Sequence, residues 1–161
     1  MKTERIGFGG SCHWCTEAVF QSLIGVKSVD QGWISALEEK DYSEAVIVHY
    51  NTSSIPLEVL IDIHLRTHNS TSNHSMRSRY RSAIYTFSQR QKVEANNILE
   101  KLQAEFKEPL ITEALSFKEF RTSDTAFQNY YRQNPNRPFC KSYIDPKLKL
   151  IIERFSSYMR T

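Results

Sequence analysis

The sequence has few glycines and few cysteines, and it has no long apolar run. All five glycines lie within the first 32 of its 161 residues, so the conformational freedom of the backbone is concentrated near the N-terminus. No segment approaches the ~20 consecutive apolar residues that a transmembrane helix needs. Residues 1–5, MKTER, lead into the first apolar residues without the apolar stretch of a signal peptide. We therefore expect a cytoplasmic protein with no membrane partner.

The chain also lacks an even set of cysteines and a strong charge of either sign. Its three cysteines are Cys12, Cys15 and Cys140, and an odd number argues against the disulfide framework of a secreted protein. In a reducing compartment, cysteines are available for chemistry. The net charge is only +3, and the basic residues are spread along the chain. No tract therefore indicates a nucleic acid as a partner.

The pattern of apolar residues predicts a single α+β domain over residues 1–161. Strands are expected near residues 6–8, 26–34, 44–50, 80–87 and 110–115. Helices are expected after residue 12 and over residues 57–68, 89–106, 123–131 and 147–159, with Phe139 and Cys140 in a non-helical stretch before the last one. This order indicates a two-layer sandwich of helices on a mixed or antiparallel sheet, with a ferredoxin-like core followed by a C-terminal coil and helix.

The residues most indicative of a chemical function are 9–17, GGSCHWCTE, at the junction of the first predicted strand and the first predicted helix. A glycine turn there places Cys12 near a helix N-terminus, where free N–H groups and the positive end of the dipole favour a thiolate. Cys15 lies one helical turn further along, within reach of a disulfide. A lone buried cysteine usually packs as a small apolar side chain, but two thiols at this spacing after a strand indicate redox chemistry or metal binding.

Five segments, in the right order, resemble the A-type peptide methionine sulfoxide reductases. Residues 10–17, GSCHWCTE, resemble the active-site stretch Gly-Cys-Phe-Trp-Gly-x-Glu of that family, and residues 42–46, YSEAV, resemble its His-Ala-Glu-Ala-Val. Residues 80–84, YRSAI, match its Tyr-Arg-Ser-Ala-Ile, and residues 129–135, NYYRQNP, match the segment before its C-terminal cysteine. Residues 139–148, FCKSYIDPKL, resemble its Tyr-Cys-x-x-x-Ile-x-Pro-Lys-Leu ending.

The resemblance implies a cofactor-free reduction of methionine S-sulfoxide, peptide-bound or free, in the repair of oxidised proteins. Cys12 would attack the sulfoxide sulfur as a nucleophile. Glu44 would supply a proton to the departing oxygen, and Tyr80 would donate a hydrogen bond to that oxygen. Trp14 would hold the S-methyl group against its apolar face.

The resemblance also implies how the enzyme is regenerated. Release of methionine leaves a sulfenic acid on Cys12, and a second cysteine condenses with it to form an intramolecular disulfide. Cys140 matches the C-terminal cysteine of the family, whereas Cys15 replaces a family glycine, and both are candidates for this resolving role. Thioredoxin or a similar dithiol would then reduce the disulfide. We expect the chain to act as a monomer.

Several positions that would contact the substrate carry other residues than the family pattern has. His13 replaces a phenylalanine and Trp33 replaces a tyrosine, and we keep both as candidate substrate-binding residues. Ser75 stands where the family has an aspartate. Arg77 and Arg79, which follow it, could attract a carboxylate such as that of free methionine sulfoxide, although charged loops are more often simply solvated.

Two other functions fit parts of the sequence. A thiol–disulfide oxidoreductase would use the Cys12/Cys15 pair directly, but Glu44 and Tyr80 would then have no role. A zinc-binding module would use tetrahedral sulfur and nitrogen ligands. Its ligands would come from Cys12, Cys15, His13, His64, His68 and His74.

Overall fold

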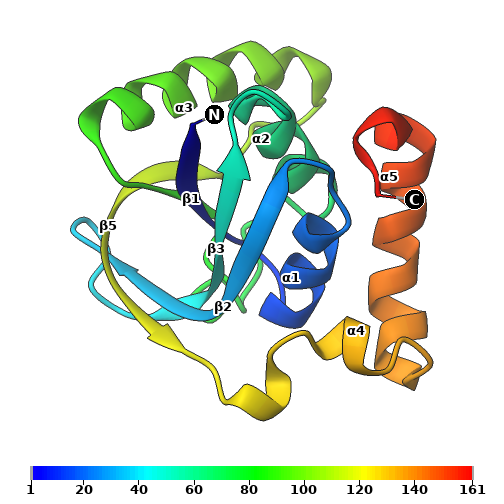
Figure 1. Ribbon diagram of the computed structural model, residues 1–161. Helices are drawn as coiled ribbons and strands as arrows, with labels where there is room; N and C mark the ends of the chain where they lie inside the picture. The colour runs from blue at the N-terminus through cyan, green and yellow to red at the C-terminus, as the bar shows by residue number, and fades with distance from the viewer. Residues whose placement is uncertain (1, 161) are drawn as a thin grey trace.

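The computed structural model describes residues 2–160, and its strands and helices follow one another in the predicted order (Figure 1). The strands are β1 (Thr3–Gly9), β2 (Val26–Ala36), β3 (Ser43–Asn51), β4 (Ala83–Thr86) and β5 (Glu113–Thr122). The helices are α1 (His13–Gln21), α2 (Leu57–Arg66), α3 (Gln89–Leu102), α4 (Tyr130–Gln133) and α5 (Asp145–Phe155). The predicted α+β class is confirmed. The predicted domain, 1–161, includes one residue at each end that lies outside the described residues.

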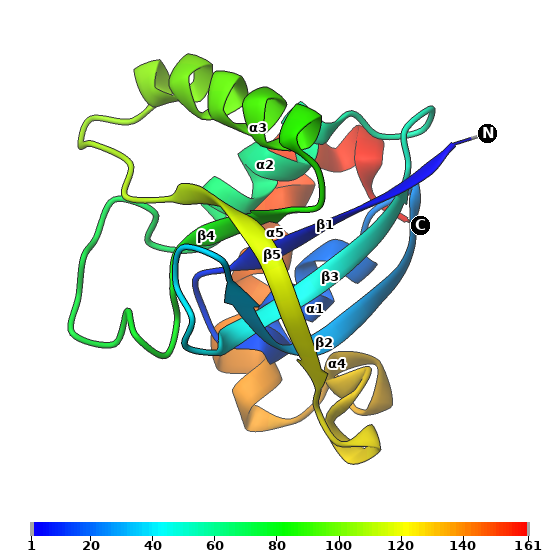
Figure 2. The same ribbon diagram turned by 90° about the vertical axis from the view of Figure 1, so that its left-hand side faces the viewer.

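The sheet is mixed and curls until it closes on itself. The strand order is β1-β3-β2-β5-β4, and β4 also pairs with β1. Neighbouring strands are antiparallel except for β4 and β5, which run parallel. The helices pack outside the curled sheet, with α3 across one end and α1 and α5 side by side along another face (Figures 1 and 2).

Side chains on the two faces of the sheet form two apolar regions. Because successive residues of a strand point to opposite faces, Ala45 and Ile47 of β3 point inside the closed sheet, whereas Val46 and Val48 point outward beneath the helices. The interior is filled by aliphatic side chains and the buried ring of Tyr85, with partly buried phenylalanine rings packed against them. A Cβ atom on Gly7 would lie 2.8 Å from the Cβ of Tyr85, so glycine at that position makes room for the ring.

The strand register gathers the candidate residues at one end of the closed sheet. Gly9, the last residue of β1, pairs with Ala45 at the start of β3 and with Ala83 at the start of β4. The chain after β1 therefore enters α1 beside Glu44, the second residue of β3, and beside the residues that lead into β4.

The predicted boundaries differ most from the structure at three segments. The helix predicted over 123–131 is instead a 3-10 turn over Thr125–Phe127 followed by the short α4. Strand β5 begins at Glu113 and continues to Thr122, so the prediction placed it too early and too short. The prediction of a non-helical stretch at Phe139 and Cys140 was wrong, because both lie in helical turns, and a π-helix over Cys140–Ile144 runs directly into α5. Pro146 has no N–H to donate to a carbonyl oxygen of the preceding turn. The regular α-helical hydrogen-bond pattern is interrupted in that turn.

Of the helices in residues 2–160, none has both the length and the apolar character needed to span a membrane.

Candidate active site

The turn that carries Cys12 is supported from behind by two histidines of the α2 region, the buried His64 and the half-buried His68. Nε2 of His64 donates to the carbonyl oxygen of Gly9 at 2.7 Å. The ring of His68 packs so closely on Gly10 that a Cβ atom there would lie 2.5 Å from its Cδ2, and the φ of Gly10 is 152°. Nδ1 of His68 donates to the carbonyl oxygen of His64, and its Nε2 accepts from the Ser82 hydroxyl at 2.8 Å. These histidines therefore shape the turn.

Cys12 is the N-cap residue of α1, and its sulfur lies among groups that favour a thiolate. Its carbonyl oxygen accepts from the N–H groups of Cys15 at 3.0 Å and Thr16 at 3.2 Å. The pKa of Cys12 is lowered, first by a hydrogen bond from the Cys15 side chain and then by the N–H groups of Trp14 and Cys15, against the opposing effects of burial and of Glu44. Cys12 is half-buried, so its sulfur is both activated and accessible.

The other two thiols lie in the same apolar cluster as Cys12. Cys15 and Cys140 are buried there with Ile144, and Cys12 packs against them. The pKa of Cys15 is raised, chiefly because its thiol hydrogen-bonds to Cys12. Burial raises the pKa of Cys140, whose thiol donates to the Asn134 carbonyl oxygen at 3.6 Å. The fold therefore brings all three cysteines together, with one of them activated.

Glu44 lies behind Cys12 and is 5% exposed. Its Oε1 accepts from the backbone N–H of His13 at 3.1 Å, and its Oε2 accepts from Nε of Arg79 at 2.8 Å. The Arg79 side chain is 63% exposed, so one of the two carboxylate contacts is to a surface group and the other is to the backbone at the start of α1. The sequence pattern gave no sign of this ion pair, because it joins residues of two separate segments.

Tyr80 follows a loop that is held by Arg77. The guanidinium of Arg77 donates to the carbonyl oxygens of Gly10 and Tyr80, both at 2.8 Å, and to those of Asn69 and Ser72. Arg77 therefore fastens the loop to the Cys12 turn and has its donors occupied by the backbone. Burial raises the pKa of Tyr80, which keeps its hydroxyl protonated as a donor.

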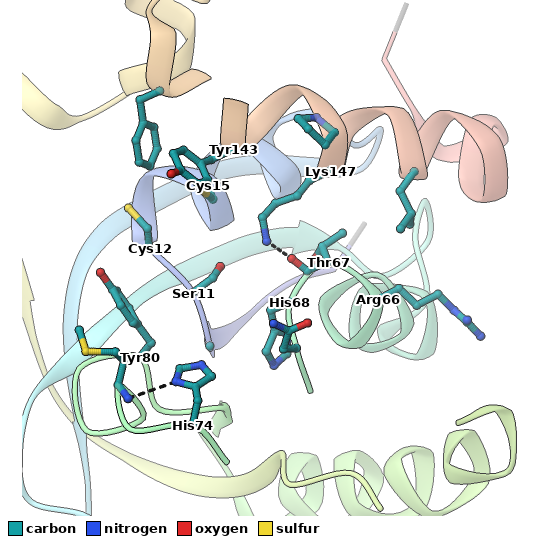
Figure 3. Close-up of a pocket in the computed structure, with 16 residues that line it drawn as sticks. Ser11, Cys12, Cys15, Arg66, Thr67, His68, His74, Tyr80, Tyr143 and Lys147 are labelled. Carbon is teal, nitrogen blue, oxygen red and sulfur yellow. Dashed lines mark hydrogen bonds between the residues drawn. The ribbon is translucent and has the colours of Figure 1, made fainter. Parts of the chain in front are cut away.

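Cys12 and Tyr80 lie at one end of a cleft of about 600 Å³ between this loop and the start of α5 (Figure 3). Figure 3 shows the Tyr80 hydroxyl directed toward Cys12, with Tyr143 and Lys147 on the opposite wall. Cavities of this size accommodate small ligands. The remaining lining residues are Gly10, Ser11, Cys15, Arg66, Thr67, His68, Asn69, His74, Met76, Phe139, Pro146 and Leu150.

Three predicted substrate-binding residues lie beside this cleft and do not line it. His13 is buried, and its Nδ1 donates to the Gly32 carbonyl oxygen at 2.7 Å. Burial lowers the pKa of His13, and its ring meets that of Trp33 edge-on with centroids 5.1 Å apart. The ring of Trp14 stacks on Tyr130 with centroids 4.2 Å apart. Contact of His13, Trp14 and Trp33 with substrate stays a prediction.

Glu17, the last residue of the motif, fixes the C-terminal segment to α1. Its carboxylate accepts from the backbone N–H groups of Asn129 at 2.9 Å and Tyr130 at 3.2 Å, and from Nε2 of Gln31 at 2.9 Å. Together with the stacking of Tyr130 on Trp14, these bonds position the segment that leads to Cys140. The sequence singled out the stretch that ends in Glu17 but not this function of its carboxylate.

The structure gathers no metal-ligand set in the part of the chain that it describes. No group of three or more His, Cys, Asp or Glu side chains within residues 2–160 is placed to hold a metal ion. Nε2 of His64 bonds to the Gly9 carbonyl oxygen, the two ring nitrogens of His68 bond to His64 and Ser82, and those of His13 face Gly32 and Glu44. Nδ1 of His64 is buried with no hydrogen-bond partner among residues 2–160, and no set of three ligand side chains gathers around it there. The zinc-binding alternative therefore has no support in this geometry.

Comparison with known proteins identifies close sequence relatives. A family model described as peptide methionine sulfoxide reductase matches residues 4–158 of the chain. The peptide methionine sulfoxide reductase MsrA of Trichodesmium erythraeum is 31% identical over 169 residues, covering 94% of this chain and 96% of the relative. The enzyme of the same name from a Psychrobacter strain is 32% identical and covers 97% of this chain and 98% of its own length.

Solved structures share the fold. Mxr1 from Saccharomyces cerevisiae in reduced form superposes with a TM-score of 0.77 at 22% identity, over 88% of this chain and 91% of that chain. Methionine sulfoxide reductase A of Corynebacterium diphtheriae gives a TM-score of 0.72 at 22% identity, over 83% and 76%. Mxr1 in complex with Trx2 gives 0.63 at 23% identity, over 80% and 85%.

Proposed function

This chain belongs to the peptide methionine sulfoxide reductase family, and we propose that it reduces methionine sulfoxide with Cys12 as the attacking thiolate. The observation that carries the proposal is the position of the Cys12 sulfur, which is activated at the N-terminus of α1 and lines a cleft shared with Tyr80. The alternative of a plain thiol–disulfide oxidoreductase leaves the buried Glu44 and the Tyr80 hydroxyl without a role.

In the first step, the Cys12 sulfur attacks the sulfoxide sulfur from the cleft. The oxygen passes to the Cys12 sulfur while methionine leaves as the thioether. Cys12 is thereby oxidised to a sulfenic acid and the sulfoxide is reduced, so no external electron donor takes part in this step. The Tyr80 hydroxyl donates a hydrogen bond to the oxygen as its charge develops.

Glu44 supplies the proton that the oxygen takes up. Its Oε1 is held by the His13 N–H, whereas the hydrogen bond to its Oε2 among residues 2–160 comes from the exposed guanidinium of Arg79. Oε2 is therefore the oxygen that can carry a proton once Arg79 moves away. Glu44 does not line the cleft, but its charge acts on the Cys12 sulfur, and a buried carboxyl group beside the nucleophile is a suitable general acid.

We propose that Cys15 is the first thiol to resolve the sulfenic acid and that Cys140 is the second. Cys15 already hydrogen-bonds to the Cys12 sulfur, so it lies in position to attack there and expel water. Cys140, in the same cluster, can then exchange with that disulfide. Peptide mapping after one equivalent of substrate tests this order. A Cys12–Cys15 link must form before any link to Cys140, and a first link between Cys12 and Cys140 would reverse it.

The reductant is a dithiol such as thioredoxin, since a yeast protein of the same fold has been solved in complex with Trx2. Three free thiols, one of them activated, suit a reducing cytoplasm. We propose a monomer as the working form.

A turnover assay with separate methionine sulfoxide epimers and dithiothreitol tests the function. The wild-type enzyme is expected to convert the S epimer to methionine and to leave the R epimer unchanged. Cys12→Ser, which is nearly isosteric, should keep the circular dichroism spectrum and lose turnover. Turnover at the wild-type rate in that variant would remove Cys12 from the mechanism.

A further inference from the structure

The wall of the cleft opposite the Cys12 turn carries a cation without an acidic partner. Lys147, near the start of α5, is half-buried, and its ammonium donates to the carbonyl oxygen of Thr67, the C-cap residue of α2 (Figure 3). Among residues 2–160, no carboxylate lies within 4.0 Å of Lys147 Nζ. The other cationic side chain on the cleft wall, Arg66, is already paired with Asp62 and Glu105.

The half-buried ammonium of Lys147 has only part of its hydrogen-bonding capacity satisfied within residues 2–160. It has three donors, and one of them is used by Thr67. Burial lowers the pKa of Lys147, since removing the charge from water is costly when no anion compensates it. The nearby groups that favour the charged form are the thiols of Cys15 and Cys12, when they are deprotonated. An anion in the cleft would therefore gain a charged partner that the protein itself does not occupy.

Arg79 is the competing cation, and its environment is less suited to this task. Its charge is paired with Glu44, its side chain is mostly solvated, and it does not line the cleft. An exposed guanidinium that is already neutralised attracts a further anion only weakly. Lys147 has neither of these disadvantages.

We propose that Lys147 binds the free carboxylate of methionine sulfoxide, either as the amino acid or as the last residue of a peptide. The inference rests on the proposed function and names its substrate class. Cys12 and Lys147 line one cleft from different sides, so the sulfur and the carboxylate of a single methionine sulfoxide can reach both. The cleft itself, about 600 Å³, encloses a ligand of this size.

A matched pair of substrates isolates the carboxylate. N-acetyl-methionine S-sulfoxide has a free carboxylate, and its N-methylamide is the same molecule with that group capped. For the wild-type enzyme, kcat/KM is expected to be about 10- to 100-fold higher for the acid, the range of one hydrogen bond to a charged group. Lys147→Met should bring the ratio of the two values close to one, whereas Lys147→Arg should keep most of it. Comparing free methionine S-sulfoxide with a dipeptide that ends in it then distinguishes the two sources of the carboxylate.

Each outcome supports or overturns the inference. Equal kcat/KM values for the acid and the amide in the wild-type enzyme overturn it without any variant. Loss of the ratio in Arg79→Gln, with the ratio kept in Lys147→Met, assigns the carboxylate to Arg79 and also overturns it. If the wild-type enzyme reduces neither substrate with dithiothreitol, the proposed function itself fails. Melting curves for both lysine variants check that loss of the bond to Thr67 leaves the fold intact.

Discussion

The chemistry of single residues here depends on which contacts are fixed and which are exposed. The Cys12 sulfur is activated by groups of its own helix turn, so its reactivity follows from local sequence. Glu44 depends on distant residues, because its two oxygens face the start of α1 and the surface residue Arg79. A change near Cys12 is therefore expected to affect the attack on the sulfoxide sulfur, whereas a change near Glu44 is expected to affect the proton transfer to the oxygen.

Replacing Glu44 with glutamine tests the assigned proton donor. The amide keeps the size of the side chain but has no acidic proton, so we expect kcat to fall by ~100- to 10,000-fold, the usual contribution of a general acid. Single-turnover release of methionine measures the effect directly. Glu39→Gln, at an exposed carboxylate, is the matched control. A loss below about threefold, well under that range, would assign the proton to another group.

At the residue scale, the family motifs named Cys12, Glu44 and Tyr80, and their roles in the reaction stay predictions. Strand register brings the ends of β1, β3 and β4 together, so these residues lie near one another in the fold. The roles of Arg77 and Arg79 could not be read from their alternation in the loop. Arg77 donates to backbone carbonyl oxygens, whereas Arg79 pairs with Glu44. The folded conformation of the loop determines these two roles.

At the scale of elements, the C-terminal helical segment is what brings the third cysteine to the site. Cys140 lies in a π-helix that is continuous with α5, and the segment before it is held to α1 by Glu17 and by the stacking of Tyr130 on Trp14. The prolines near Cys140 indicated a coil. Proline also suits the first turn of a helix, where its missing N–H is not needed, and that property prevailed here.

Loosening this attachment is expected to expose Cys140. Glu17→Gln replaces one acceptor oxygen by an amide donor that faces backbone N–H groups, and a hydrogen bond to a charged group contributes about 1.5–3 kcal/mol. In a Cys12→Ser/Cys15→Ser background, Cys140 is the one remaining thiol of the sequence. Its rate of labelling by a thiol reagent should rise at least about tenfold.

The control for this measurement is Glu153→Gln, at an exposed position of α5. It should leave the labelling rate unchanged. An unchanged rate in Glu17→Gln as well would mean that the helix contacts of Cys140, and not the Glu17 carboxylate, hold the segment in place.

At the scale of the whole molecule, closure of the sheet depends on pairings between distant strands. The alternating patterns of residues 80–87 and 110–115 predicted strands, but they could not show that β4 pairs with both β1 and β5. The same limit applies to His64 and His68. Their helical spacing was visible, whereas their contacts with Gly9 and Gly10 follow only from the fold.

Burial of His64 makes stability depend on pH. Its pKa in the folded protein is lowered to about 4 from an ordinary value of 6.5, chiefly by burial. Between these pH values the unfolded chain takes up a proton that the folded protein does not. Stability is therefore complete above pH 6.5 and falls as the pH drops toward 4, by up to about 3 kcal/mol for this residue. The pKa of His68 is shifted in the same direction.

Urea unfolding at a series of pH values measures this dependence. In His64→Gln, whose amide can still donate to Gly9, the loss of stability between pH 7 and pH 4.5 should be smaller than in the wild-type protein. The same change at His74, on the partly exposed loop, serves as the control. An identical pH dependence in wild type and His64→Gln would show that this histidine is not buried in the neutral form.

The measurement that tests the account most directly is the trapping of the first oxidised product. In a Cys15→Ser/Cys140→Ser variant, one equivalent of methionine S-sulfoxide is added without reductant, and the protein is treated with dimedone, which reacts with sulfenic acids. We predict one methionine released per enzyme and one dimedone adduct, on the peptide that contains Cys12. Release of methionine with Cys12 unmodified would contradict the assignment of Cys12 as the residue that accepts the oxygen.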